Sequence, residues 1–188
     1  YVSRFWKSLG ADEPAAGFSQ RGSDAYVFRF DWDDLPVDIE NEDIKALYGA
    51  SHGIDYPFVF GADKTWFSDK VFIAEDKFLS SGMMSYWAAF AYNGKPGKGR
   101  SGEMPEWRPW QNDDPQQDKM LIFDTQDEGG IRMSSEHGSR QQVLDHLADD
   151  PRVRSVDKLC RLYRDILEHS HTFLTLGEYN VVEGGLCK

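Results

Sequence analysis

The sequence predicts a chain of the α/β class. Short runs of aromatic and β-branched residues, each bounded by turn-forming residues, indicate strands at three places. Two longer stretches repeat apolar residues every three or four positions, which is typical of amphipathic helices. The chain has 188 residues, of which 40% are hydrophobic and 14% aromatic, so it can fill the core of one ordinary domain.

The first strand is expected at residues 25–30, Ala-Tyr-Val-Phe-Arg-Phe, between Gly22-Ser23-Asp24 and the acidic run 31–34. Residues 56–60 have a similar composition, but Pro57 lacks a backbone N–H donor, which limits the segment to a sheet edge or a packed loop. We expect it to be a buried connection. Residues 119–123 and 131–133 flank a turn-forming segment at 127–130. They predict two short strands that could form a hairpin.

A long helix is expected to begin with Ser68 as its N-cap and to end at Asn93-Gly94. Its apolar positions are Phe72, Leu79, Met83, Trp87 and Phe90. Residues 94–102 then predict a surface loop, followed by Trp107 and Trp110 as aromatic anchors. A further helix is predicted from Ser155 and a short one over residues 42–48.

These elements are too few and too widely separated to make a regular sheet sandwich or helical bundle. We therefore expect apolar helix residues such as Phe72, Met83 and Trp87 to remain uncovered unless a partner completes the fold. The chain begins with Tyr1, without an initiator Met or a signal-peptide pattern, which suggests a start inside a longer translation product.

The formal net charge of -11 argues against nucleic acid or an anionic membrane as a partner, because such binding depends on clustered Lys and Arg. No apolar run reaches the length of a membrane span. Cys160 and Cys187 lack the spacing of metal ligands, and either one disulfide bond or two free thiols fits the sequence. His137, His146, His169 and His171 are scattered, so no metal or other cofactor is indicated.

Gly49-Ala50-Ser51-His52-Gly53 matches the G-x-S-x-G string of a nucleophile elbow. That motif requires a strand directly before the serine and a helix directly after it. Residues 42–48 are helix-like and Ile54-Asp55-Tyr56-Pro57 follows, so the context does not favour Ser51 as a nucleophile. His52, in a Gly-containing loop ahead of an apolar run, could act as a general base or be an ordinary loop histidine.

Residues 25–33 and 49–61 together resemble the C-terminal part of type-B carboxylesterases, the cholinesterase-like branch of the α/β-hydrolases. The resemblance extends to Trp6-Lys7-x-x-Gly10, to the helix around Tyr86-Trp87, to Pro105-Glu106-Trp107 and to Gly130-Ile131-Arg132, and is closest to the bacterial branch. It is weaker after about Ser135. It implies that residues 1–188 are the C-terminal portion of an α/β-hydrolase domain, with late strands of a mixed sheet and covering helices, completed by another chain.

The resemblance places the triad histidine at His52. It makes Asp55 and Ser51 neighbours that support this histidine, and it places Tyr48 at the wall of the substrate pocket. Asp55 could equally be a plain exposed residue, and for Tyr48 the residues themselves favour simple core packing over a pocket wall. The family's nucleophile elbow, oxyanion loop and triad acid lie N-terminal to the region resembled here.

We therefore expect a serine esterase in which a complementary N-terminal chain supplies the nucleophile and the acid, and a small-molecule ester is the substrate. No cofactor, metal, nucleic acid or membrane is implied. Two alternatives are a non-catalytic cholinesterase-like interaction domain and a single-chain hydrolase that uses Ser51.

Overall fold

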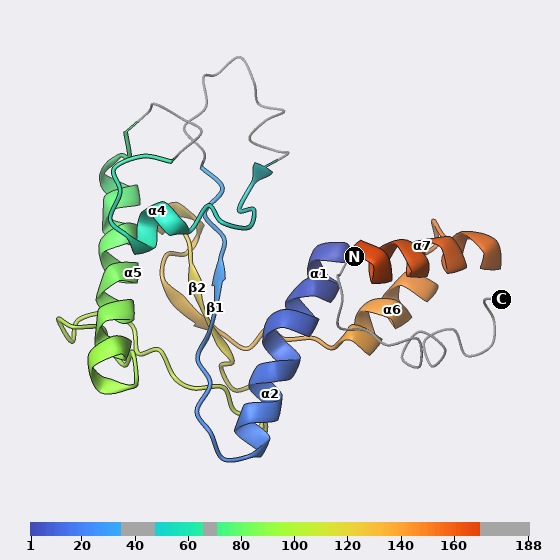
Figure 1. Ribbon diagram of the computed structural model, residues 1–188, viewed down its shortest axis with the longest axis horizontal. Helices are drawn as coiled ribbons and strands as arrows, with labels where there is room; N and C mark the ends of the chain where they lie inside the picture. Colours follow the sequence, from blue (N-terminus) through green and yellow to red (C-terminus); the bar gives the residue numbers. More distant parts are fainter. Residues whose placement is uncertain (35–47, 66–70, 170–188) are drawn as a thin grey trace. The chain divides into compact units, whose positions relative to one another are not determined.

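The computed structural model describes residues 1–34, 48–65 and 71–169. The chain divides into two compact units. One is built from residues 1–23 and the described part of 137–188, and the other is Asp24–Glu136. The ribbon in Figure 1 labels their elements.

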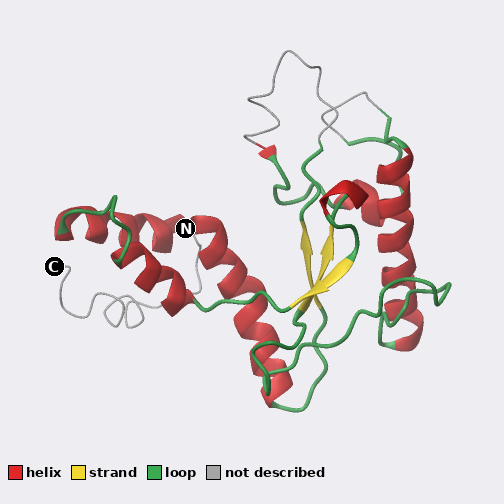
Figure 2. Ribbon diagram, turned by 180° about the vertical axis from the view of Figure 1, so that it is seen from behind, coloured by secondary structure: helices red, strands yellow, loops and turns green. Residues whose placement is uncertain are grey.

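The unit Asp24–Glu136 contains a three-stranded mixed sheet with the order β1-β2-β3. β1 (Val27–Phe30) runs parallel to β2 (Met120–Phe123), with Val27 opposite Met120, and β2 pairs antiparallel with β3 (Arg132–Ser134). A short 3-10 helix, Gln126–Glu128, connects β2 to β3. The three strands, yellow in Figure 2, confirm the predicted strand and the predicted hairpin.

The long helix α5 (Ala74–Asn93) supplies most of the helical core of this unit. It lies beside the sheet in Figure 1. All four residues of β2 are buried, as is typical of a central strand covered on both faces. The core contains Trp32, Ile54, Phe58, Phe72, Leu79, Met83, Tyr86, Trp107, Leu121, Phe123 and Ile131.

Two predictions for α5 need correction. The helix begins at Ala74 rather than near Ser68, which lies outside the described residues, because Ile73 is extended and serves as the N-cap. Phe72 and Met83, expected to be uncovered, are buried in the core of the same unit, while Trp87 is partly buried. The end at Asn93 is confirmed, since Gly94 adopts a left-handed conformation and donates its N–H to Phe90 O at 2.8 Å.

Residues 56–60 also differ from expectation, because Tyr56–Val59 form a one-turn helix, α4. Pro57 lies in its first turn, where the missing N–H has no intrahelical acceptor in any case. Pro57 and Phe58 are buried but Tyr56 and Phe60 are exposed, so the prediction of a buried connection holds only for the middle of the segment, and its backbone is helical. Trp107 and Trp110, the predicted anchors of the following long loop, are buried as well.

The other unit is helical. α1 (Val2–Lys7), a π-helical turn (Ser8–Asp12) and α2 (Glu13–Gln20) follow one another without a break, and α6 (Arg140–Ala148) and α7 (Val156–His169) complete the described part. Its core contains Phe5, Val143, Leu144, Leu147, Tyr163 and Ile166. The helix from Ser155 is confirmed as α7, whereas α1, α2 and α6 were not predicted.

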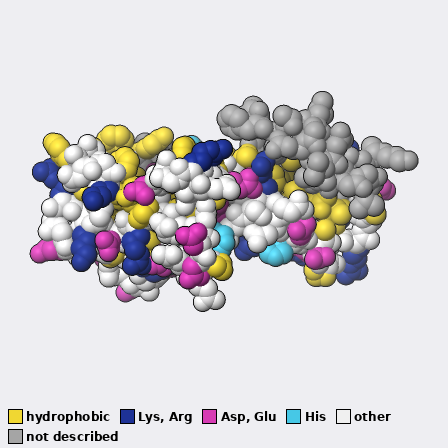
Figure 3. Space-filling view, turned by 90° about the horizontal axis from the view of Figure 1, so that it is seen from below, with side chains coloured by type: hydrophobic (Ala, Val, Ile, Leu, Met, Phe, Trp, Pro, Cys, Tyr) yellow, Lys and Arg dark blue, Asp and Glu magenta, His cyan; other side chains and the backbone are white. Residues whose placement is uncertain are grey.

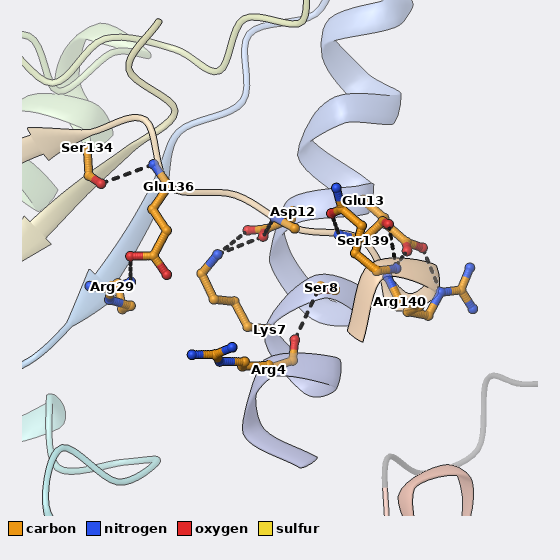
Figure 4. Close-up of polar contacts among 12 residues, drawn as sticks. Arg4, Lys7, Ser8, Asp12, Glu13, Arg29, Ser134, Glu136, Ser139 and Arg140 are labelled. Atoms are coloured by element: carbon orange, nitrogen blue, oxygen red, sulfur yellow. Dashed lines mark hydrogen bonds and ion pairs between the residues drawn. The ribbon is translucent and has the colours of Figure 1, made fainter. Parts of the chain in front are cut away.

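Polar contacts join α6 to the N-terminal helices within this unit (Figure 4). The buried Asp12 carboxylate accepts from Lys7 Nζ at 2.6 Å and from the Gly138 amide at 2.9 Å. Glu13 accepts from the Arg140 amide and from its guanidinium. The buried carboxylate of Asp12 is therefore paired with a charge and with a backbone donor, as a buried charge requires.

The surface mixes charged and apolar side chains, as the face in Figure 3 shows. In the described part of the chain, none of the helices combines the length and the apolar content needed to cross a bilayer. Cys160 on α7 is disulfide-bonded, and Cys187 lies outside the described residues.

Candidate active site

His52 lies in a tight turn that leads directly into α4. The amide of Ile54 donates to Ser51 O at 3.2 Å, and the amide of Tyr56 donates to Gly53 O at 3.3 Å. Gly53 has a φ of 88°, a conformation that residues with a Cβ rarely adopt. The chain can therefore reverse immediately after His52 because the next residue is glycine.

The turn is fixed to the core by the residues that follow it. Ile54 and Phe58 are both buried, and the Phe58 ring lies 4.8 Å from the ring of Trp32 and 4.5 Å from that of Phe72. Ser80 on α5 donates its hydroxyl to Phe58 O at 2.8 Å. A short turn with two buried anchors on its C-terminal side has little freedom to move relative to the sheet.

The structure places the predicted site residues at different depths. Ser51 and His52 are exposed, and Asp55 is partly buried at the N-cap of α4, where its side chain makes no capping hydrogen bond. Tyr48 is 50% exposed, so core packing does not account for it within the described residues. The fold therefore brings Ser51, His52 and Asp55 into one turn and presents the imidazole at the surface.

The geometry around Ser51 differs from that of a nucleophile elbow. Tyr48 is helical and Gly49-Ala50 form a turn, so the residues directly before the serine are not a strand. The elbow depends on a strand to point the hydroxyl out of a strained turn at the sheet edge. Residues 42–47, where a helix was predicted, lie outside the described residues.

A family model described as the carboxylesterase family matches residues 7–143 of the chain. This match covers more than half of the 188 residues. The chain belongs to the carboxylesterase family. The matched residues include β1, the His52 turn, α4, α5 and the β2–β3 hairpin, and α7 lies beyond them.

Curated relatives agree with this membership of the carboxylesterase family. Carboxylesterase 4A of Bos taurus is 34% identical over 88 residues, which are 47% of this chain and 14% of that protein. Acylcarnitine hydrolase of Rattus norvegicus is 39% identical over 77 residues, which are 41% of this chain and 12% of that protein. The chain thus aligns with a small part of each relative, and because both are mammalian, the resemblance to the bacterial branch stays a prediction.

This carboxylesterase-family chain contains the G-x-S-x-G string once, at Gly49–Gly53. Ester hydrolysis also needs an activated serine and hydrogen-bond donors for the oxyanion. The described residues show neither an elbow around Ser51 nor another serine in such a context. What the His52 turn can offer is an accessible imidazole on a fixed backbone, able to accept a proton from a hydroxyl and return it to a leaving group.

An acidic group at the carboxyl ends of β1 and β2 was not predicted. Carboxylate oxygens of the exposed residues Asp33, Asp34 and Glu128 lie within 4.8 Å of one another. The charge of Asp33 and then that of Asp124 raise the pKa of Glu128 above its ordinary value. Within the described ranges these three are the residues grouped closely enough to hold a metal ion, but exposed carboxylates gather in this way without one.

A second unpredicted feature is the buried carboxylate of Asp76, which is 4% exposed. It accepts from the Trp32 indole N–H at 2.8 Å and from the Ile73 amide at 2.9 Å. Burial raises the pKa of Asp76, although both hydrogen bonds act in the opposite direction. The sequence signal that could have found it is an acidic residue three positions after the N-cap of a helix.

A cavity of about 560 Å³ lies in the helical unit and is lined by Tyr1, Leu147, Arg152, Ile166 and neighbouring residues. It contains none of the predicted site residues. The cavity therefore gives no support to the predicted site residues, and the role of His52 stays a prediction.

Proposed function

We propose that this chain provides His52 as the general base, and then the general acid, of a serine carboxylesterase. The nucleophilic serine, the triad acid and the oxyanion donors come from a complementary N-terminal chain of the same enzyme. In the first step His52 takes the proton of the serine hydroxyl as the serine attacks the ester carbonyl. It returns that proton to the departing alcohol, and water then repeats the cycle on the acyl-enzyme.

The observation that carries the proposal is the exposed imidazole of His52 on a turn held by the buried Ile54 and Phe58. A general base must stay within hydrogen-bond reach of its serine, so it needs a fixed backbone and a free approach from one side. Family membership supports the ester hydrolase chemistry, and the name of the rat relative, acylcarnitine hydrolase, supports a carboxylic ester with an acyl group as the substrate.

The proposal is tested in the assembled enzyme with His52→Ala and Ser51→Ala. Turnover of a chromogenic short-chain ester should fall by roughly 10⁴-fold or more in His52→Ala, because removing one triad member disables the unit. Ser51→Ala should keep most of the activity, since Ser51 does not follow a strand.

His146→Ala is the matched control, because His146 is an exposed histidine in the helical unit and should leave turnover unchanged. A fluorophosphonate probe should label a serine outside this chain. If the probe labels Ser51, and both Ser51→Ala and His52→Ala are inactive, the single-chain alternative is correct. Full activity of His52→Ala would show that another residue is the base, and an assembly that never reacts with the probe would indicate a non-catalytic interaction domain.

A further inference from the structure

The Trp32–Asp76 hydrogen bond connects the end of β1 to the start of α5. Trp32 lies two residues after β1, is fully buried, and donates its indole N–H to Asp76 Oδ1 at 2.8 Å. The other carboxylate oxygen accepts from the Ile73 amide at 2.9 Å and so caps α5. One buried carboxylate therefore fixes both the orientation of the indole ring and the first turn of the helix.

The same indole ring packs against the ring of Phe58. The two ring centroids are 4.8 Å apart at an interplanar angle of 61°. Phe58 also packs against Phe30 and Phe72, and Ser80 of α5 donates to its carbonyl oxygen. Because Phe58 lies in α4, directly after the His52 turn, the orientation of Trp32 affects where that turn lies.

Loss of the indole donor would leave part of a buried carboxylate without a partner. Such a group is costly in an apolar core, so the surroundings shift until water or another donor reaches it. The groups nearest to this shift are the first turn of α5 and the ring stack that holds Phe58. The His52 turn would therefore move or loosen while the rest of the core stayed folded.

We propose that Trp32 and Asp76 are positioning residues for the reaction, which hold the His52 turn at the carboxyl edge of β1 and β2. This inference rests on the proposed role of His52. It goes beyond that role because it assigns a function to two buried residues that touch neither the substrate nor the imidazole.

Trp107 provides a matched control. Its indole N–H also makes a buried hydrogen bond, to Val27 O at 3.1 Å, in the same core. Its described ring contacts are with Tyr26, Phe28, Tyr86, Trp87 and Phe123, none of which belongs to the His52 turn or to α4. Trp32→Phe and Trp107→Phe thus each remove one buried indole hydrogen bond from the same unit, the first to a carboxylate and the second to a backbone carbonyl.

The experiment compares Trp32→Phe, Asp76→Asn and Trp107→Phe in the assembled enzyme. All three should lower the melting temperature. Trp32→Phe and Asp76→Asn should lower kcat by about 10- to 100-fold with KM nearly unchanged, because a small misplacement of a catalytic group affects the chemical step. The double variant should lose little more than the larger single effect, since both substitutions break one interaction.

Hydrogen exchange of the backbone amides of residues 51–60 provides a reading that does not depend on activity. Exchange there should accelerate in Trp32→Phe and remain as in the unmodified protein in Trp107→Phe. Equal losses of kcat in the two Trp variants, or an unchanged kcat in Trp32→Phe, would overturn the positioning role. If His52→Ala proves active, the proposed function fails. In that case faster exchange in Trp32→Phe alone would still support the positioning of the turn by Trp32. Equal exchange rates in Trp32→Phe and Trp107→Phe would refute that positioning.

Discussion

Gly53 determines how His52 is presented. Its positive φ lets the chain turn toward the core directly after the histidine, so that Ile54 is buried while His52 stays exposed. A residue with a Cβ would be strained in that conformation, at a cost of about 1–2 kcal/mol. The chain could relieve the strain only by changing the direction of the turn.

Gly53→Ala is therefore expected to lower the free energy of unfolding by about 1–2 kcal/mol and to reduce ester turnover more than substrate affinity. Thermal unfolding and steady-state kinetics of the assembled enzyme measure the two effects. Gly17→Ala is the control, since Gly17 is in α2 and a Cβ added there would lie 3.5 Å from Arg21 Nη1, an ordinary van der Waals contact. That substitution should stabilise the protein by about 1 kcal/mol through helix propensity, and a similar gain for Gly53→Ala would contradict the role given to Gly53.

Among the elements, α6 shows how side chains replace the hydrogen bonds missing at the start of a helix. Ser139 Oγ accepts from the Gln142 amide at 3.2 Å, and Gln142 Oε1 accepts from the Ser139 amide at 2.9 Å. Glu13 accepts from the Arg140 amide in addition. These contacts stabilise a short helix of nine residues that would be marginal in isolation.

Ser139→Ala removes the capping hydroxyl and should lower the free energy of unfolding by about 1 kcal/mol. Differential scanning calorimetry of the assembled protein measures the change. Ser139→Asp keeps an acceptor at the N-cap and should restore most of the stability. Equal destabilisation by Ala and Asp would show that the cap contributes little here.

The elements that sequence reasoning found carry strong local signals. β1 and the β2–β3 hairpin are dense in aromatic and β-branched residues between turns, and Gly94 marks the end of α5. α6 was missed because its signal is the short pattern from Ser139 to Gln142, and α4 because an aromatic run with Pro57 resembles an edge strand. Local composition alone does not separate one helical turn from a short strand.

The site could be predicted only in part for a related reason. The role of His52 was inferred from the resemblance of residues 49–61 to the family and stays a prediction, while the structure shows its turn and the anchors of that turn. The Trp32–Asp76 bond joins residues 44 positions apart, so no local pattern indicates it. Whether Asp55 supports the imidazole and Tyr48 lines a pocket stays a prediction, because the partner groups belong to the proposed complementary chain.

At the scale of the molecule, exposed apolar residues of the unit Asp24–Glu136 suggest a surface that binds another chain. Phe60 is 80% exposed and Tyr92 is 76% exposed, and Ile73, Phe78 and Phe90 are also exposed. Within the described sheet β1 pairs on one side only, with β2. Isolated apolar residues are common on surfaces, but several large ones in the same unit as a strand with one edge unpaired in the described sheet favour association.

We therefore expect the purified 188-residue chain to be unstable as a monomer. Light scattering after size exclusion should show self-association, and calorimetry should show a broad transition in place of a cooperative one. Addition of the complementary chain should give a stoichiometric complex with a sharp transition. A monomer that melts cooperatively would refute the requirement for a second chain.

The aromatic core has an optical consequence. The ring centroids of Trp87 and Trp107 are 5.6 Å apart, and those of Trp107 and Phe123 are 5.9 Å apart. The ring of Trp32 packs against that of Phe58. Rings held this rigidly in an asymmetric surrounding produce strong near-ultraviolet circular dichroism bands, which vanish when specific packing is lost even if helices persist. Residues 24–136 therefore carry an intrinsic, label-free signal that separates a packed state from a merely helical one.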